Sequence, residues 1–150
     1  IRTGFENVVP LTNLQGRWQV MQQNPLVIMD TAHNKAGIEF ISRQLRAQKY
    51  EKLHIVIGMV NDKDITGVLS LLPKDAEYYF TAAQIERALP AKELKIQAEK
   101  AGLSGNEYSS VNLAVNAALL HAGKNDIVYI GGSNFVVGEA MILFDTTSQL

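Results

Sequence analysis

The sequence predicts an α/β domain built on a mostly parallel sheet of about five or six strands, with helices on both faces in a Rossmann-like arrangement. Three observations lead to this fold class. Short segments rich in β-branched and aromatic residues alternate with segments of helical periodicity. Most strand-like segments are apolar throughout, as expected of strands covered on both faces. The chain has 150 residues, 47% of them hydrophobic, and can bury a core without a metal or disulfide.

The strands are predicted from short apolar runs between turn-forming residues. Two weaker candidates lie near 106–108 and near 16–21, the latter in the segment that leads into the domain. The stronger strand predictions are Leu26–Met29, Leu53–Ile57, Glu77–Thr81 and Asp126–Ile130.

The segments between these strands carry the i, i+3, i+7 spacing that lines one face of a helix with apolar residues. Such stripes run over 38–45, 65–72 and 94–101, and 111–122 is apolar nearly all round, which predicts a buried helix. Residues 135–144 are apolar and fit either a helix or a last strand. The residues that mark helix starts are Asp64, Pro90 and Ser110, and those that follow helix ends are Gly102 and Gly123.

Composition and charge exclude several classes of protein. The net charge is −1 with no basic run, so neither nucleic acid nor a membrane is an expected partner. No apolar run approaches the ~20 residues that span a bilayer, and no signal peptide is recognisable. The absence of cysteine excludes thiolate zinc sites and agrees with a cytoplasmic location.

The chain is expected to be a piece of a larger protein, because it opens on Ile1 and not on methionine. Residues 1–24 are polar and irregular, and we interpret them as the segment leading into the domain, with one strand at most. Residues 25–150 are interpreted as a single α/β domain.

The distinctive polar residues follow the predicted strands. They stand at Asp30–Asn34, at 58–64, at Thr81 and at Gly131–Asn134. In an open parallel sheet, the carboxyl ends of the strands meet at one edge, and ligands bind there. Four loops would therefore converge on one rim, which predicts a ligand site.

Each of these loops also has a purely structural interpretation. Asp30 either contacts a ligand or ends a strand and caps the next helix. His33 taken alone is more typical of a surface or capping position, and 62–64 is more typical of a solvated turn. Gly131–Ser133 either binds an anion through backbone N–H groups or forms a turn that needs small residues.

Several well-known motifs are absent from the sequence. There is no Gly-x-x-x-x-Gly-Lys-Ser/Thr phosphate loop, no Gly-x-Gly-x-x-Gly after the first strand, and no Gly-x-Ser-x-Gly or His-Glu-x-x-His. The histidines His33, His54 and His121 are not spaced as a metal-binding set. His54 falls inside a strand and His121 in the last turn of a helix, where a structural role is expected.

Together these loops resemble the C-terminal domain of the Mur-ligase superfamily, and within it the dihydrofolate/folylpolyglutamate synthases. Asp-Thr-Ala-His-Asn at 30–34, combined with Gly-Arg-Trp-Gln at 16–19, is typical of the folate branch. The chain departs from the family at Lys35 and Gln15, where proline is common. The other matching pieces are 62–65 and 131–139.

The resemblance implies an ATP-dependent ligase that joins L-glutamate to dihydropteroate or folate through an acyl phosphate, in folate biosynthesis and one-carbon metabolism. It implies a central domain in the same chain, which packs on this one and supplies the phosphate loop and the Mg²⁺ ligands. We therefore expect the isolated chain to be inactive. Family members are commonly monomers, which implies a monomer here.

The family's site residues carry over by motif. The residues implied to bind ATP are Arg17, Asp30 and Asn34. Ser133 and His33 are implied to bind the glutamate, and His33 is also the candidate catalytic residue. Lys63 is implied to face the closed cleft, and no residue of this chain is implied to bind metal.

Other functions remain open at this point. A ligase of the same superfamily that acts on cell-wall precursors shares the fold, and Gly-Arg-Trp-Gln favours the folate branch over it. A nucleotide-binding module without catalysis, or an interaction domain whose rim residues only cap helices, would belong to other classes. The choice between dihydrofolate synthesis and folate tail extension depends on a pteroate pocket mostly outside this chain.

Overall fold

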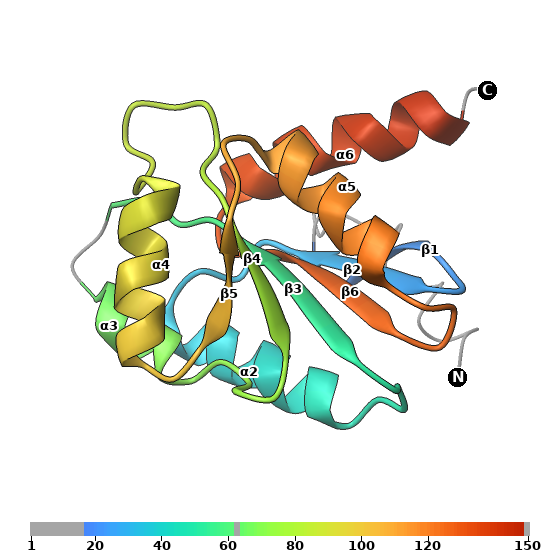
Figure 1. Ribbon diagram of the computed structural model, residues 1–150, viewed down its shortest axis with the longest axis horizontal. Helices are drawn as coiled ribbons and strands as arrows, with labels where there is room; N and C mark the ends of the chain where they lie inside the picture. The colour runs from blue at the N-terminus through green and yellow to red at the C-terminus, as the bar shows by residue number, and fades with distance from the viewer. Residues whose placement is uncertain (1–16, 62–63, 149–150) are drawn as a thin grey trace.

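The computed structural model describes residues 17–61 and 64–148, which form a six-stranded sheet with helices on both faces (Figure 1). The strands are β1 (Gln19–Gln22), β2 (Leu26–Asp30), β3 (Leu53–Ile57), β4 (Glu77–Phe80), β5 (Ser104–Glu107) and β6 (Ile127–Gly131). Their order across the sheet is β1-β2-β6-β3-β4-β5. β1 pairs antiparallel with β2, and every other neighbouring pair is parallel. The predicted fold class is therefore confirmed.

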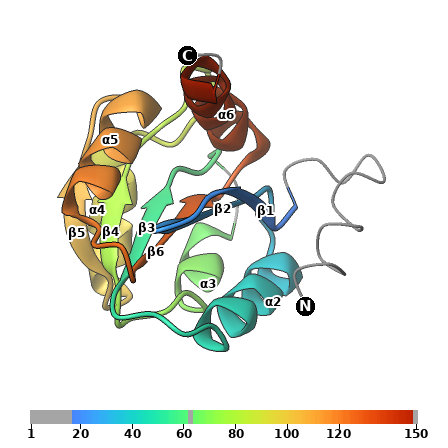
Figure 2. The same ribbon diagram turned by 90° about the vertical axis from the view of Figure 1, so that its right-hand side faces the viewer.

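The helices fall into two layers, one on each face of the sheet (Figure 2). They are α2 (Lys35–Arg46), α3 (Ile65–Leu69), α4 (Ala91–Lys100), α5 (Val111–His121) and α6 (Asn134–Ser148). From β2 to β5 the chain advances in one direction, and right-handed crossovers keep α2, α3 and α4 on one face. The chain then returns through α5 to insert β6 between β2 and β3, so α5 and α6 cover the other face.

Two apolar cores explain why the strands are apolar throughout. Successive side chains of a strand point to opposite faces of the sheet. Ile28 accordingly packs in the core beneath α2, α3 and α4, whereas Val27 and Met29 pack in the core beneath α5 and α6. In β4 the same division sends Tyr78 to the first core and Tyr79 to the second. The continuous apolar runs were thus a correct sign of strands covered on both faces.

The weaker secondary-structure predictions are settled by the structure. The strand expected near 16–21 is β1, an antiparallel edge strand, although Gly16 lies outside the described residues. The strand expected near 106–108 is β5. The ambiguous segment 135–144 is helical and belongs to α6.

Two details of the helix prediction were wrong. The stripe 65–72 was expected to be one helix, but α3 ends at Leu69. Pro73 follows, and a proline disfavours helical geometry in the residue before it, so the chain leaves in tight turns at Leu71 and Leu72. Asp64 stands at the N-cap position but makes no capping hydrogen bond. Its carboxylate instead lies 3.4 Å from the Lys35 ammonium.

The other predicted helix boundaries are confirmed. Ser110 caps α5 by accepting a hydrogen bond from the Leu113 N–H at 3.1 Å. Pro90 directly precedes α4, and Gly102 follows its end with φ +88°. No helix of the described residues is both long and apolar enough to cross a bilayer.

Candidate functional site

The carboxyl ends of β2, β6 and β3 lie side by side at one edge of the sheet. Strand register places Gly131 directly beside Asp30 on one side and beside Ile57 on the other. β2 continues into α2 on one face, whereas its neighbour β6 continues into α6 on the opposite face. Ligands of open α/β sheets bind where neighbouring connections part in this way. The fold therefore points to this edge as the candidate site.

A cleft of about 360 Å³ opens at this edge beside α2. It gathers four of the residues predicted from the sequence to form a site: Arg17, Asp30, His33 and Asn34. Trp18, Ala32, Gly37, Phe40 and Ile41 give it a largely apolar wall, and Thr31 and Asn134 complete the lining. The cleft thus combines an apolar wall with polar groups, as small-molecule sites commonly do.

Asp30 is the buried carboxylate of the cleft, with 4% of its surface exposed. Its Oδ2 accepts a hydrogen bond from the Trp18 N–H at 2.7 Å, and its Oδ1 accepts one from the Ala32 N–H at 2.8 Å. Burial raises the pKa of Asp30 above its ordinary value, against the opposing effects of these two N–H groups and of Arg17. Asp30 ends β2, as its structural interpretation expected, but it does not cap α2, because the N-cap residue is Asn34.

Asn34 and His33 stand where the chain passes from β2 into α2. The Asn34 side chain caps α2 by accepting a hydrogen bond from the Gly37 N–H at 2.9 Å. His33 is exposed, and its Nδ1 lies 3.2 Å from the Thr31 carbonyl oxygen. Asn34 therefore shapes the start of the helix, while the imidazole of His33 faces solvent at the mouth of the cleft.

Ser133 lies at the start of α6 and is not part of the cleft lining. Its Oγ accepts a hydrogen bond from the Val136 N–H at 3.1 Å, so its hydroxyl caps α6. Its position is set by Gly132, which has φ +103° and whose added Cβ would overlap the Gly58 carbonyl oxygen. Gly131 and Gly132 are thus needed for close packing of strand ends, which was one of the two interpretations of this turn.

Two further residues, Lys63 and Phe40, bear on the lining of the cleft. Lys63, the remaining predicted cleft residue, lies outside the described residues. Phe40 lines the cleft and is 54% exposed, although no motif in the sequence points to it. The sequence feature that could have indicated it is an aromatic residue next to Ile41, on the otherwise polar, solvent-facing side of the helix.

The cleft does not fit a divalent metal ion. Among the residues the structure describes, no group of three or more His, Cys, Asp or Glu side chains could hold one. Mg²⁺ prefers several oxygen ligands in octahedral geometry. Asp30 is the carboxylate that lines this cleft, and both of its oxygens already accept backbone N–H groups.

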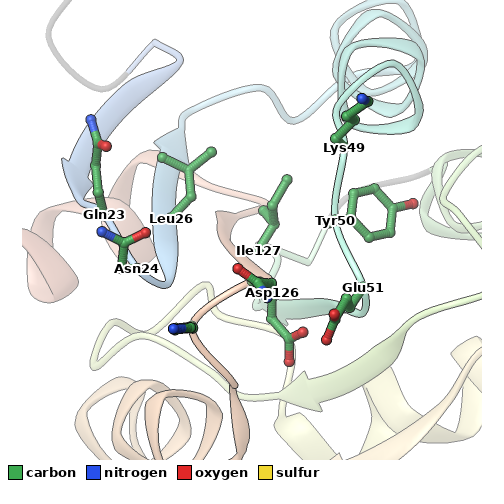
Figure 3. Close-up of a pocket in the computed structure, with 10 residues that line it drawn as sticks. Gln23, Asn24, Leu26, Lys49, Tyr50, Glu51, Asp126 and Ile127 are labelled. Atoms are coloured by element: carbon green, nitrogen blue, oxygen red, sulfur yellow. The ribbon is translucent and has the colours of Figure 1, made fainter.

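A second hollow, of about 420 Å³, lies at the opposite, amino end of the sheet (Figure 3). It mixes the cations Lys49 and Lys124 with the carboxylates of Glu51 and Asp126. Asp126 belongs to a side-chain network, because its Oδ2 lies 2.9 Å from His54 Nε2. Cations and carboxylates are therefore mixed in this hollow, and no cluster of like-charged side chains forms there.

The network continues from His54 into the sheet. His54 Nδ1 lies 2.9 Å from the Tyr79 hydroxyl, which in turn lies 3.1 Å from His121 Nδ1. Burial raises the pKa of Tyr79, so its hydroxyl stays protonated. For Asp126, the hydrogen bonds from His54 and the Gly123 N–H outweigh burial and lower the pKa. The expected structural roles of His54 and His121 agree with this geometry.

Comparison with known proteins gives a consistent result. Residues 16–134 match the family model described as "Mur ligase, glutamate ligase domain". The dihydrofolate synthase/folylpolyglutamate synthase of Escherichia coli (strain K12) is 33% identical over 147 residues, which cover 97% of this chain and 33% of that protein.

Solved structures agree with the sequence match. E. coli FolC in complex with DHPP and ADP superposes with a TM-score of 0.82 at 31% identity, covering 90% of this chain and 32% of that one. A bifunctional folylpolyglutamate synthase/dihydrofolate synthase with Mn, AMPPNP and L-glutamate bound gives a TM-score of 0.80 at 30% identity, with the same coverage. The chain spans about a third of the length of the relatives it matches.

Proposed function

Because this chain belongs to the Mur ligase glutamate ligase domain family, we propose that it faces ATP and glutamate in a ligase that joins L-glutamate to dihydropteroate or folate. The chain is homologous to the C-terminal region of dihydrofolate/folylpolyglutamate synthases and corresponds to about a third of their length. The family predicted from the motifs is thereby confirmed. What we propose here is the activity of the whole protein, together with its substrates and partners.

The observation that carries the proposal is the gathering of Arg17, Asp30, His33 and Asn34 around one cleft at the carboxyl edge of the sheet. An exposed guanidinium beside an apolar wall suits a nucleotide, which has charged phosphates at one end and a flat base at the other. Relatives of the same fold have been solved with ADP or AMPPNP, which supports this choice of ligand.

The proposed reaction has two steps. A carboxylate of dihydropteroate or folate attacks the γ-phosphate of ATP, forming an acyl phosphate and releasing ADP. The glutamate amine then attacks the acyl carbon, forming the amide and releasing phosphate. The first step requires groups that offset the negative charge of the phosphates. The second step requires an amine held close to the acyl carbon and the exclusion of water.

This chain would supply positioning and charge to that reaction. Arg17, Asp30 and Asn34 form the proposed ATP-binding wall. His33 and Ser133 are the proposed glutamate-binding residues, with His33 as the catalytic candidate. The Ser133 hydroxyl accepts the Val136 N–H and retains its own O–H to donate to a carboxylate.

The phosphate loop and the magnesium ligands are proposed to lie in a central domain of the same protein, against which this domain packs. The sequence contains no phosphate loop, and the cleft does not fit a divalent cation. We accordingly assign no step of the reaction to a metal held by this chain. We predict that the chain alone forms no ADP.

The test is ADP release by the complete protein with ATP, Mg²⁺ and L-glutamate, using either dihydropteroate or a reduced folate as acceptor. Release with dihydropteroate would establish dihydrofolate synthesis, and release with reduced folate would establish tail extension. Release with neither from a folded protein would contradict the proposal. Release with a cell-wall precursor would then indicate the other branch of the superfamily, and binding of ATP without turnover would indicate a non-catalytic module.

A further inference from the structure

Four side chains at the amino end of the sheet form a continuous line of polar contacts that runs from the core to the surface. Asp126 Oδ2 lies 2.9 Å from His54 Nε2, and His54 Nδ1 lies 2.9 Å from the Tyr79 hydroxyl. The same hydroxyl lies 3.1 Å from His121 Nδ1. His54 has none of its surface exposed, whereas the side chain of His121 is 46% exposed. The proposed ligase reaction uses none of these groups.

The carboxylate of Asp126 places a hydrogen on one nitrogen of His54. Against the effect of burial, hydrogen bonds from His54 and from the Gly123 N–H lower the pKa of Asp126, so its carboxyl group is ionised at neutral pH. An ionised carboxylate only accepts hydrogen bonds. His54 Nε2 therefore carries a hydrogen whether the ring is neutral or charged. The charge of the ring is decided at Nδ1, which faces the Tyr79 hydroxyl.

The Tyr79 hydroxyl has one hydrogen and lies between two ring nitrogens. Burial raises the pKa of Tyr79, so the hydroxyl keeps this hydrogen. It can then donate to one imidazole and accept from the other. If it donates to His54, His121 must present an N–H at Nδ1, and if it donates to His121, His54 must do so. Two N–H groups pointing at the hydroxyl would leave one hydrogen bond unmade.

The surroundings of the two rings favour a positive charge on His121. This residue is the last of α5, and a helix C-terminus stabilises a positive charge. Its Nδ1 lies 3.7 Å from the Glu77 carboxylate, and its side chain reaches solvent. His54 by contrast is fully buried, where a charged ring loses its hydration. Its hydrogen bond to Asp126 forms without the charge, because Nε2 carries a hydrogen in either state.

Two further groups act on the Tyr79 hydroxyl. Glu77 and Tyr108 both interact with it electrostatically, and the Tyr108 ring stacks on the Tyr79 ring with centroids 5.8 Å apart. The Glu77 carboxylate already lies 2.9 Å from the Lys52 ammonium. If the hydroxyl nevertheless donated its hydrogen to Glu77, both histidines could point an N–H at it. That arrangement differs from the one described above in a way that can be observed.

We propose that the Tyr79 hydroxyl couples the two histidines, so that the exposed His121 takes up a proton while the buried His54 stays neutral. His121 then keeps its hydrogen on Nδ1 in both of its charge states and gains the second one on Nε2. Acidification through the range in which histidines titrate therefore charges the surface at the amino end of the sheet and not its core. This coupling does not depend on the proposed ligase activity.

The first test is nitrogen NMR of the histidine rings, in which a nitrogen that carries a hydrogen is distinguished from one that does not. Between about pH 8 and about pH 5, His54 should keep its hydrogen on Nε2 and a bare Nδ1. His121 should hold a hydrogen on Nδ1 throughout and gain one on Nε2. Hydrogens on both Nδ1 atoms at once, or a second hydrogen on His54 while His121 stays neutral, would overturn the proposal.

A double-mutant cycle separates the hydrogen-bonded coupling from simple repulsion between two charged rings. His121→Leu removes the competing ring, and should raise the ratio of charged to neutral His54 at about pH 5 by about fivefold or more. In the Tyr79→Phe background, which lacks the hydroxyl, the same substitution should change this ratio by less than about twofold. An equal rise in both backgrounds would show that the rings interact through charge alone and would overturn the proposal.

His33 is the internal control for both experiments. It is exposed and stands at the opposite edge of the sheet, in the loop after β2, so its titration should be the same in wild type and in every variant. The wild-type spectra need no substitution, so they decide the proposal even if Tyr79→Phe does not fold.

Discussion

The two ends of the sheet each bury an aspartate, and the two carboxylates find their partners in different ways. At the amino end, Asp126 pairs with the His54 ring, and the chain of side chains continues through Tyr79 to His121. At the carboxyl end, Asp30 accepts two backbone N–H groups. The first arrangement links side chains to one another, from Asp126 before β6 through β3 and β4 to α5, and the hollow beside it mixes cations with carboxylates. The second lies in a cleft that gathers Arg17, His33 and Asn34. A buried aspartate thus indicates a site only together with the groups that line the hollow beside it.

The largest effect is expected at the carboxyl end, from Gly132→Ala. The new Cβ would overlap the Gly58 carbonyl oxygen, and the residue would keep an unfavourable positive φ. Strain and overpacking together should lower the free energy of unfolding by roughly 3 to 4 kcal/mol, measured by urea denaturation. Gly123→Ala is the matched control, because its Cβ would meet Asp126 Oδ2 at an ordinary 3.8 Å. Equal losses in both variants would contradict the steric argument.

Disrupting the network at the amino end of the sheet should lower the free energy of unfolding by nearly as much. His54→Leu leaves Asp126 and the Tyr79 hydroxyl each without one partner in a buried region, and should cost roughly 2 to 3 kcal/mol of unfolding free energy. His121→Leu alters the exposed histidine of the same network, and should cost less than about 1 kcal/mol. Both losses are measured by urea denaturation. A larger loss in His121→Leu than in His54→Leu would contradict this account of the network.

The two aspartates should also give pH effects of opposite sign. The pKa of Asp126 is lowered in the folded state, so its stabilising contribution is present above 3.8 and is lost as pH falls through the folded pKa. The pKa of Asp30 is raised, mainly by burial, so its relative contribution is greatest below 3.8 and is lost as pH rises through the folded pKa.

The measurement is the unfolding free energy of wild type minus that of Asp126→Asn and of Asp30→Asn, between about pH 2.5 and about pH 6. The difference for Asp126→Asn should grow with pH, and the difference for Asp30→Asn should shrink. Parallel slopes for the two variants would show that the two carboxylates do not differ in the way described.

The smallest effect, and a favourable one, is expected from Gly138→Ala in α6. No atom lies within 4 Å of the Cβ that alanine would add, and the position is exposed. Alanine loses less backbone entropy in a helix than glycine, so the unfolding free energy should rise by about 1 kcal/mol. A thermal or urea melt would show it. A loss of stability would mean that this part of the Gly131–Glu139 motif requires glycine for a reason that the packing of α6 does not supply.

Much of the local structure could be predicted from the sequence. Apolar runs located the buried strands, the helical stripes located α2, α4 and α5, and Ser110 marked a true helix start. The predictions for the Asp64 cap and for the end of α3 were wrong. Capping preferences and apolar stripes are statistical tendencies, and the packing around a particular residue can override them. At the rim, the sequence identified Asp30 and Asn34 correctly as polar strand-end residues but did not decide what they bind.

What the sequence by itself determined is therefore the periodicity of each segment, most of the segment ends, and the family of the chain. Only the tertiary structure decided which segments meet. Insertion of β6 between β2 and β3 set Gly131 beside Asp30, and it brought Asp126 to His54, which is 72 residues away along the chain. Periodicity is a local property, because it reflects the burial of each side chain in its own helix or strand. The partner of a buried carboxylate depends instead on the path of the whole backbone, which the spacing of residues does not record.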